Sequence, residues 1–302
     1  MILIKQMMVF LVMMILGYAM ARKKILDIKV TKAISWIIVN IANPALIISG
    51  SIGNAIEKME LLSVLKVSIA IYIILIVLAE IIIPFFRFQN KEVGVYKLLL
   101  VFSNIGFMGF PLISAICGNK ALLIASIFLL PFNFLIYTYG IFQLVGKTEN
   151  IGIIVKKVVN VGVIAVIITF TIALMQVQLP YILSQSILML GNLSAPLCMM
   201  VIGASFNDIS FRKMFCNVKL FIFCIIRLLI VPYILMQLVM SFTSDNILQK
   251  VIFVVVATPA GSMVSMIAHQ YDGEYLVASE GVVISTLLSI VTMPVLFQIL
   301  NF

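Results

Sequence analysis

Two segments place helix-breaking residues and polar side chains inside otherwise apolar stretches, and they are the clearest candidates for chemistry. Asn104–Pro111 reads NIGFMGFP, and Val256–Met263 reads VATPAGSM. Proline removes a backbone donor and glycine adds backbone freedom, so each segment predicts a broken helix. The helix N-termini that a break frees attract anions such as carboxylates. We therefore expect a small-anion site between the two segments. Its candidate residues are Asn104, Gly106, Gly109, Pro111, Thr258, Pro259, Gly261 and Ser262.

Several other polar residues lie within apolar stretches and could support such a site. Arg227 lies near the middle of its stretch, where an arginine costs at least about 2.5–3.5 kcal/mol in a bilayer. We expect it to face a cavity or a partner, as an anion attractor, a brace for the broken helices or a member of an ion pair. Glu80 and Glu280 lie closer to the ends of their stretches and are expected to be interfacial rather than to carry protons. Asparagines that could hydrogen-bond between helices are Asn43, Asn133 and Asn192.

The composition identifies the surroundings of these segments as a lipid bilayer. Of 302 residues, 64% are hydrophobic and 10% are charged, against about 45–50% and about 25% in soluble domains. One span needs about 20 residues, so the length accommodates ten spans and leaves no room for a soluble domain. A phosphate-binding GxxxxGK[ST] stretch is missing, which excludes ATP-driven transport by this chain. The four cysteines form no CxxC pair, and we expect neither a metal site nor a cofactor.

Basic residues predict the orientation of the spans. We place the spans at 2–21, 33–52, 61–85, 97–117, 120–145, 158–178, 181–205, 215–241, 248–269 and 276–299. With the N-terminus outside, the cytoplasmic loops hold 14 Lys and Arg residues and the outer loops five, and Arg227 falls within a span. This bias places both termini outside the cell (inner) membrane and accounts for the net charge of +9 without nucleic acid. Met7–Tyr18 could be the core of a signal peptide, but the basic residues follow it, which favours a retained span.

The chain divides into two halves of five spans each. The divisions are 1–146, a cytoplasmic linker at 147–157, and 158–302. Because five is odd, the halves must have opposite orientations, as in the inverted repeats of many secondary transporters. An offset of 152 residues aligns Pro44 with Pro196 and Gly109 with Gly261. The predicted fold is an all-α integral membrane protein with ten helices in two inverted repeats, in which the broken spans 4 and 9 cross.

Four stretches carry a resemblance to the auxin efflux carrier (PIN-like) family in its short prokaryotic form. They read IANPALIISG in span 2, FSNIGFMGFPLISAICGNKAL through span 4, LSAPLCMMVIGASF in span 7, and ATPAGSMVSMIAHQYDGEYLVASEGVVISTLLSIVTMP through spans 9 and 10. The resemblance implies a fold similar to bile-acid symporters and sodium–proton antiporters. Spans 1, 2, 6 and 7 would form a scaffold, and spans 3–5 and 8–10 a moving transport domain. Asn104 would hydrogen-bond a substrate carboxylate, and Pro111 and Pro259 would terminate half-helices. The second break has no asparagine, and the long loop of plant members is replaced by the short linker.

These observations predict a membrane transporter rather than an enzyme. Short prokaryotic relatives are usually described as permeases for malate or similar acids, so we expect a secondary-active or facilitative carrier of small organic anions working by alternating access. The expected partners are the anion, the lipid bilayer, a coupling proton or sodium ion, and a second copy in a homodimer. A monovalent-cation/proton antiporter on the same fold is the main alternative, but it needs a carboxylate at the crossing, and spans 4 and 9 contain none there. An intramembrane enzyme would need an acidic pair, a Ser/His dyad or metal ligands at mid-depth.

Overall fold

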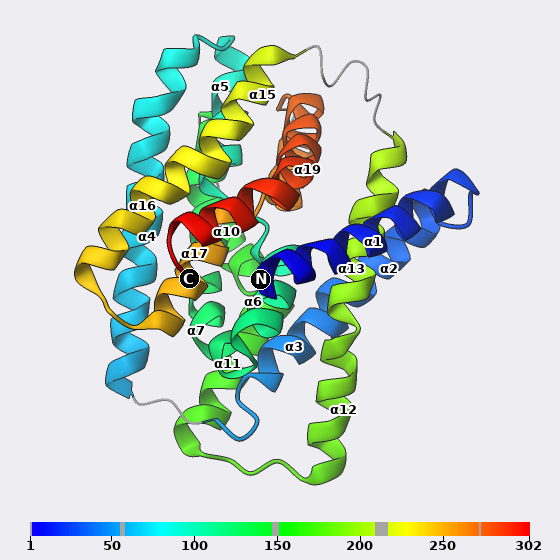
Figure 1. The fold of residues 1–302 in the computed structure, drawn as a ribbon, viewed down its shortest axis with the longest axis vertical. Helices are drawn as coiled ribbons and strands as arrows, with labels where there is room; N and C mark the ends of the chain where they lie inside the picture. Colours follow the sequence, from blue (N-terminus) through cyan, green and yellow to red (C-terminus); the bar gives the residue numbers. More distant parts are fainter. Residues whose placement is uncertain (1, 55–57, 147–150, 209–216, 272) are drawn as a thin grey trace.

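The computed structural model describes residues 2–54, 58–146, 151–208, 217–271 and 273–302 (Figure 1). Within these ranges every regular element is helical, and one isolated antiparallel bridge joins Ser103 to Ala260. Part of the predicted linker (147–150) and three of the basic residues used for the orientation, Lys147, Arg212 and Lys213, lie outside the described residues.

The helices follow the predicted apolar stretches. In chain order they are α1 (Ile2–Arg22), α2 (Ile28–Ile37), η1 (Ile38–Ala42), α3 (Asn43–Ser49), α4 (Lys58–Phe86), α5 (Asn90–Val101), η2 (Ile105–Gly109), α6 (Phe110–Cys117), α7 (Lys120–Ile127), α8 (Leu129–Leu135), η3 (Ile136–Gly140), α9 (Ile141–Val145), α10 (Ile151–Val158), α11 (Val161–Met175), α12 (Tyr181–Asn192), α13 (Ser194–Ser205), η4 (Phe206–Asp208), α15 (Val218–Ile225), η5 (Ile226–Ile230), α16 (Val231–Phe242), α17 (Asn246–Ala257), α18 (Ser262–Gln270) and α19 (Tyr275–Ile299). The elements η1, η2, η3 and η5 are single π-helical turns within longer helices.

Seven described helical segments are long and apolar enough to cross a membrane. Three further apolar helices are shorter, and they are Ile105–Cys117, Val161–Met175 and Asn246–Ala257. Two of these belong to the spans predicted to be broken, which explains why they are too short to cross alone. The protein is therefore a multi-pass helical membrane protein, and its division into ten spans and two inverted repeats stays a prediction.

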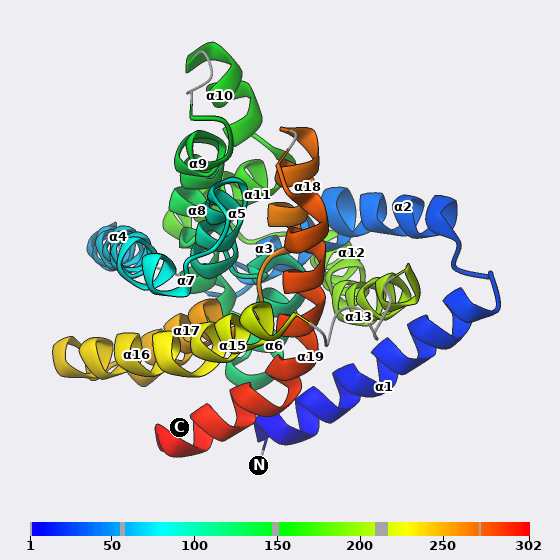
Figure 2. The same ribbon diagram turned by 90° about the horizontal axis from the view of Figure 1, so that it is seen from above.

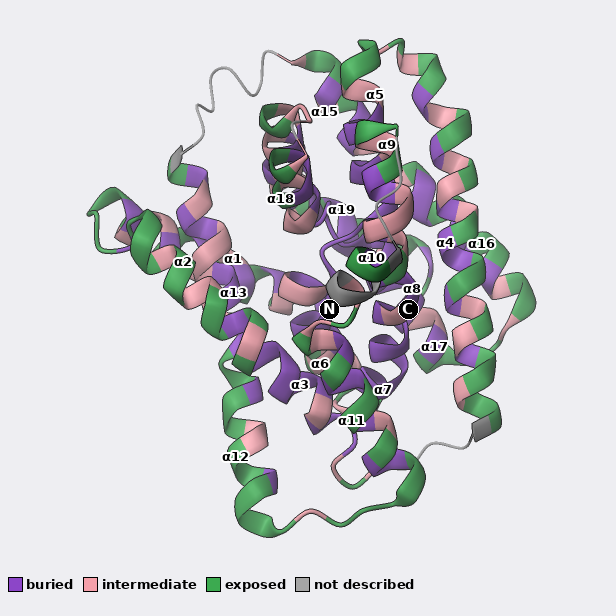
Figure 3. Ribbon diagram, turned by 180° about the vertical axis from the view of Figure 1, so that it is seen from behind, coloured by how far each residue is buried: buried purple, intermediate pink, exposed green. Residues whose placement is uncertain are grey.

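The helices form two groups around a buried centre. Helices α1, α2, α12 and α13 lie on one side, and α4, α15, α16 and α17 lie on the other, in both views (Figures 1 and 2). Figure 3 shows buried residues gathered at the centre and exposed residues on the outward faces of α2, α4 and α12. Many of these outward residues are apolar: Phe85 on α4 is 81% exposed and Ile182 on α12 is 79% exposed. Apolar outward faces are what helices in contact with lipid tails require.

Close backbone contact fixes α1 against α13. A Cβ atom added at Gly17 would lie 2.1 Å from the carbonyl oxygen of Met200, and one added at Gly203 would lie 1.9 Å from that of Met14. Any larger residue at either glycine would push the helices apart. Helix contacts of this type, with small residues at the interface, are typical of membrane proteins because lipid tails are as apolar as leucine and association depends on close packing.

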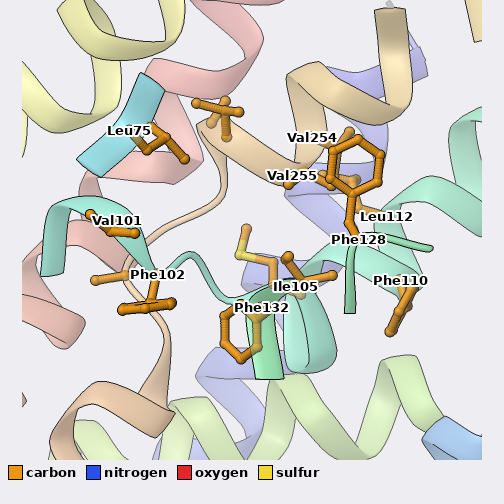
Figure 4. Close-up of a cluster of buried hydrophobic side chains, with 14 of the residues drawn as sticks. Leu75, Val101, Phe102, Ile105, Phe110, Leu112, Phe128, Phe132, Val254 and Val255 are labelled. Atoms are coloured by element: carbon orange, nitrogen blue, oxygen red, sulfur yellow. The ribbon is translucent and has the colours of Figure 1, made fainter. Parts of the chain in front are cut away.

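Apolar side chains from several helices enclose the region between α5 and α6. Phe102, which follows α5, packs edge-to-face on Phe132 of α8 with ring centroids 5.4 Å apart. Leu75 of α4 and Val254 of α17 belong to the same buried cluster (Figure 4). This packing keeps the end of α5 in a dry environment, where every backbone polar group needs a partner.

Candidate functional site

The first broken helix is interrupted between α5 and η2. The backbone is extended at Phe102, and Asn104 caps the next helix by accepting a hydrogen bond at Oδ1 from the Phe107 N–H, 3.3 Å away. Helical backbone then runs from Ile105 through α6. Pro111 lies inside this second half-helix, which corrects its expected role as a terminator. It stands at one of the first positions of α6, where the preceding π turn accommodates a residue without an N–H.

The second break separates α17 from α18. Thr258 ends α17 in an extended conformation, and Gly261 precedes α18 in an extended conformation. Pro259 lies between them, within the break as the sequence indicates. None of the four residues 258–261 of this break has a charged side chain, and its one polar side chain, that of Thr258, is fully buried.

The two breaks pair with each other through backbone hydrogen bonds. The Asn104 N–H donates to the Pro259 carbonyl over 2.8 Å, and the Gly261 N–H donates to the Phe102 carbonyl over 2.9 Å. A Cβ atom at Gly261 would lie 3.0 Å from the Ser103 carbonyl oxygen, so a larger residue here would force the two breaks slightly apart. We call the paired segments 102–104 and 258–261 the junction. This pairing satisfies groups that the broken helices cannot bond internally.

Arg227 binds the C-terminal ends of both half-helices that enter the junction. It lies in the π turn η5 and is 1% exposed. Its Nε donates to the Leu99 carbonyl at the end of α5 over 2.7 Å, and its Nη1 donates to the Thr258 carbonyl at the end of α17, also over 2.7 Å. Its Nη2 donates to the Ser103 hydroxyl over 2.9 Å. Of the roles considered from the sequence, these contacts match the brace for the broken helices.

Arg227 has no carboxylate partner in the described part of the chain. The ion pairs found there are Lys91–Glu274 and Lys97–Glu80. The partial negative charges of two helix C-termini therefore act as its counter-charge. A helix end carries about half an elementary charge, so two of them together balance one guanidinium.

The N-terminal ends of the two second half-helices have unused donors. Within the described ranges, the backbone N–H groups of Gly106, Ser262 and Met263 donate to no protein acceptor. The same holds for the Asn104 side-chain nitrogen, since its oxygen is the atom that caps η2. Gly106, Ser262 and Met263 are half-buried, whereas the C-terminal ends bound by Arg227 are buried. The helix N-termini next to the junction thus have donors without a protein acceptor, whereas the guanidinium of Arg227 at the helix C-termini is buried.

A polar chain links the first break to the other group of helices. The Asn43 side-chain nitrogen donates to the Gly106 carbonyl over 3.0 Å, and the Ser194 hydroxyl donates to the Asn43 side-chain oxygen. Asn43 precedes Pro44, and Ser194 lies just before Pro196, in the two segments that the 152-residue offset aligns. The sequence analysis did not identify Ser194, although this alignment could have indicated it. It also did not identify Ser103 or Ser285. The Ser285 hydroxyl accepts a hydrogen bond from the Ala260 N–H over 3.1 Å.

Among the remaining candidates, Gly109 contacts the junction, because its N–H donates to the Asn104 carbonyl over 3.0 Å, and the others lie outside the paired segments. Glu80 pairs with Lys97 over 2.6 Å and accepts from the Tyr139 hydroxyl over 3.2 Å. Asn133 accepts at its side-chain oxygen from Asn160, the residue that caps α11, over 2.7 Å, which is the interhelical bond expected of it. Glu280 on α19 is half-buried and forms no ion pair among the described residues. Gly109 is buried within η2, and Asn192 is exposed.

Neither of the two main cavities reaches the junction. One, of about 680 Å³, lies beside the turn between α1 and α2, and the other, of about 460 Å³, lies beside the loop between α11 and α12. The described residues contain no group of three His, Cys, Asp or Glu side chains that could hold a metal ion.

Comparison with known protein families supplies a further observation. The model of the membrane transport protein family matches residues 2–297. This family includes auxin efflux carrier (PIN-like) members, so the resemblance seen in the motifs is supported at the level of the family. No curated protein matches the chain.

Proposed function

Because the chain belongs to the membrane transport protein family, we propose that it carries small organic anions across the membrane at the junction. The family is one of transporters and not of enzymes. The proposed substrates are carboxylates such as malate or auxin-like acids, moved by secondary-active or facilitated transport with alternating access.

The buried Arg227 is the observation that carries this proposal. Its charge balances the two helix C-termini at the junction, at about half a negative charge each. The N-termini of η2 and α18 then contribute about one positive charge in total that no protein group balances. One carboxylate placed between these N-termini would restore neutrality. The site is thus best matched to a single carboxylate group of the substrate.

The free donors at the junction support the same chemistry. A carboxylate accepts several hydrogen bonds, and the unused N–H groups of Gly106, Ser262 and Met263 and the Asn104 side-chain nitrogen are donors without acceptors. Hydrogen bonds to a charged group are worth about 1.5–3 kcal/mol each. An anion would therefore satisfy donors that no described protein group pairs.

The main alternative, a monovalent-cation/proton antiporter, is disfavoured by the same residue. A cation would have to bind beside the fixed guanidinium of Arg227, and the junction has no carboxylate to attract it or to take up a proton. An intramembrane enzyme is disfavoured because the junction contains hydroxyls and amides without a base or metal ligand beside them.

We also propose a division into a scaffold and a moving domain, which is supported by the position of α1, α2, α12 and α13, from spans 1, 2 and 7, on one side of the molecule in Figures 1 and 2. Spans 1, 2, 6 and 7 would be the scaffold, and spans 3–5 and 8–10 the transport domain. The bond from Asn43 to the Gly106 carbonyl would join the two and must break or shift when the site opens. Alternating access would then be movement of the junction relative to α3 and α13.

The proposed orientation has both termini outside and the 147–157 linker in the cytoplasm, from the distribution of basic residues. Single cysteines in a cysteine-free background test it. Val159→Cys, next to the linker, should react with an impermeant thiol reagent only when the inner face is exposed, and Tyr181→Cys should react from outside intact cells. Both side chains are exposed. Labelling of Val159→Cys from outside intact cells would contradict the proposed orientation.

Uptake into proteoliposomes tests the substrate class. Radiolabelled malate, indole acetate and a panel of other mono- and dicarboxylates are measured with and without imposed proton and sodium gradients. We expect saturable uptake of at least one carboxylate, lost in Arg227→Met and retained in Arg87→Met, the same change at an exposed arginine. Sodium or lithium exchange against protons without carboxylate uptake would support the antiporter instead.

A further inference from the structure

A basic cavity lies far from the junction, at the turn between α1 and α2. Its volume of about 680 Å³ is within the range of roughly 300–1,000 Å³ that is usual for small-molecule sites. Helix α1 ends here, α2 begins here, and the end of α13 forms the opposite wall. The close contact of α1 with α13 through Gly17 and Gly203 holds these walls in place.

The polar lining of the cavity is cationic. Lys24, Lys29 and Lys32 line it, and none of them forms an ion pair with a described residue. Asp27 is the one acidic residue of the lining, and its side chain is occupied in capping α2, where it accepts from the Val30 N–H over 2.8 Å. Among the described residues, the cavity therefore holds three lysines without an ion pair against one carboxylate, and suits an anion.

The lining also contains the uncharged polar residues Thr31, Ser205 and Asn207, and its remaining residues are apolar. Ala21, Leu26 and Ala204 form a small buried cluster of their own and contribute to its floor. Next to it, Ile25 is 54% exposed and Ile28 is 66% exposed. The turn projects from the body of the molecule (Figures 1 and 2). A soluble anion would need only the lysines, whereas a lipid would use both the lysines and the apolar surface.

We propose that this cavity binds the phosphate-bearing head group of an anionic phospholipid, with the lysines on the phosphate and the acyl chains along α2. The proposal does not depend on which substrate the junction carries. Free phosphate shares the recognising chemistry and is the alternative source of the ligand. Basic pockets between membrane helices at a membrane surface are known to recognise anionic head groups in this way.

The single tryptophan of the chain provides a local reporter. Trp36 lies on α2 four residues after Lys32, on the same side of the helix, and is 60% exposed. The purified full chain is placed in nanodiscs of phosphatidylcholine, to which brominated phosphatidylglycerol or brominated phosphatidylcholine is added. Bromine quenches tryptophan fluorescence on contact, so the difference between the two lipids measures head-group selectivity next to the cavity.

We expect brominated phosphatidylglycerol to quench Trp36 at a lower mole fraction than brominated phosphatidylcholine does. In Lys29→Ala/Lys32→Ala the preference should fall by about 30-fold, because each lysine near an anionic surface strengthens binding about fivefold. Lys29→Arg/Lys32→Arg should retain it, which separates loss of charge from misfolding. Lys5→Ala/Lys219→Ala removes two exposed lysines outside the cavity and should also retain it.

Three results would overturn the proposal. Equal quenching by the two lipids would show that no head group is selected. An unchanged preference in Lys29→Ala/Lys32→Ala would show that the lysines are not the ligands. Abolition of the preference by inorganic phosphate at constant ionic strength would make free phosphate the ligand and not a lipid.

Discussion

Arg227→Met removes the guanidinium while leaving an unbranched side chain of similar reach. The junction then keeps about one negative charge from the C-termini of α5 and α17, with nothing to balance it. The three residues from Phe102 to Asn104 separate these C-termini from the N-terminal donors, a span of at most about 10 Å. One unit of charge at about 10 Å and an effective dielectric constant of about 20 changes the energy of an anion by about 1.7 kcal/mol. Anion affinity should therefore fall by roughly 20-fold.

The stability of Arg227→Met is a poorer measure than its affinity for the anion. Leaving the Leu99 and Thr258 carbonyls unpaired costs about 1–3 kcal/mol each, but losing the buried charge recovers several kcal/mol of desolvation. The two effects oppose each other, so the free energy of unfolding can change in either direction. In contrast, the loss of the positive charge can only weaken the binding of an anion.

A series at this position separates charge from hydrogen bonding. Arg227→Lys keeps the charge with fewer donors, and Arg227→Gln keeps donors without the charge. Equilibrium binding of a radiolabelled carboxylate to purified, monodisperse variants at low salt is the assay, with Arg87→Gln as the control. We expect affinity in the order wild type, Lys, Gln, Met. If the Gln and Met variants bind the transported anion as tightly as the wild type, the charge balance argued for the junction is wrong.

Five other variants test particular contacts. Asn104→Asp keeps the oxygen that caps η2 but adds a negative charge, so we expect unchanged thermal stability and an anion affinity weakened by at least about tenfold. Asn104→Ala removes the cap, so we expect it to lose about 0.5–2 kcal/mol of stability and about tenfold in anion affinity. Denaturant titration measures the stability, and binding isotherms measure the anion affinity. Wild-type affinity in both variants would show that the anion does not bind at Asn104. Gly261→Ala should lower uptake, because its Cβ would lie 3.0 Å from a carbonyl oxygen of the facing break and would force the two breaks slightly apart, while Gly109→Ala meets nothing closer than 3.5 Å and should transport normally. Gly203→Ala places a Cβ 1.9 Å from a carbonyl oxygen of α1, so we expect a lowered melting temperature and loss of the monodisperse peak in size-exclusion chromatography; a wild-type profile would mean that α1 can move away freely.

The positions of the breaks were partly readable from local sequence. Pro259 and Gly261 lie in the second break, where the pattern VATPAGSM predicts it. In the first half the break begins at Phe102, ahead of the NIGFMGFP segment, and Pro111 lies within a helix. The reason is that the π turn before Pro111 accommodates a residue without an N–H inside a continuous helix, so a proline there does not mark a helix end.

The amino-acid sequence by itself determined that this is a multi-pass helical membrane protein of a transport family, because solvent class and helix length depend on composition and on runs of apolar residues. It also indicated that a mid-membrane arginine needs partners. Only the tertiary structure decided which partners they are. Arg227 binds carbonyl groups of Leu99 and Thr258, and backbone carbonyls are present at every residue, so no side-chain pattern can mark them. The contact of Ser194 with Asn43 joins residues 151 positions apart and likewise depends on the packing of distant helices.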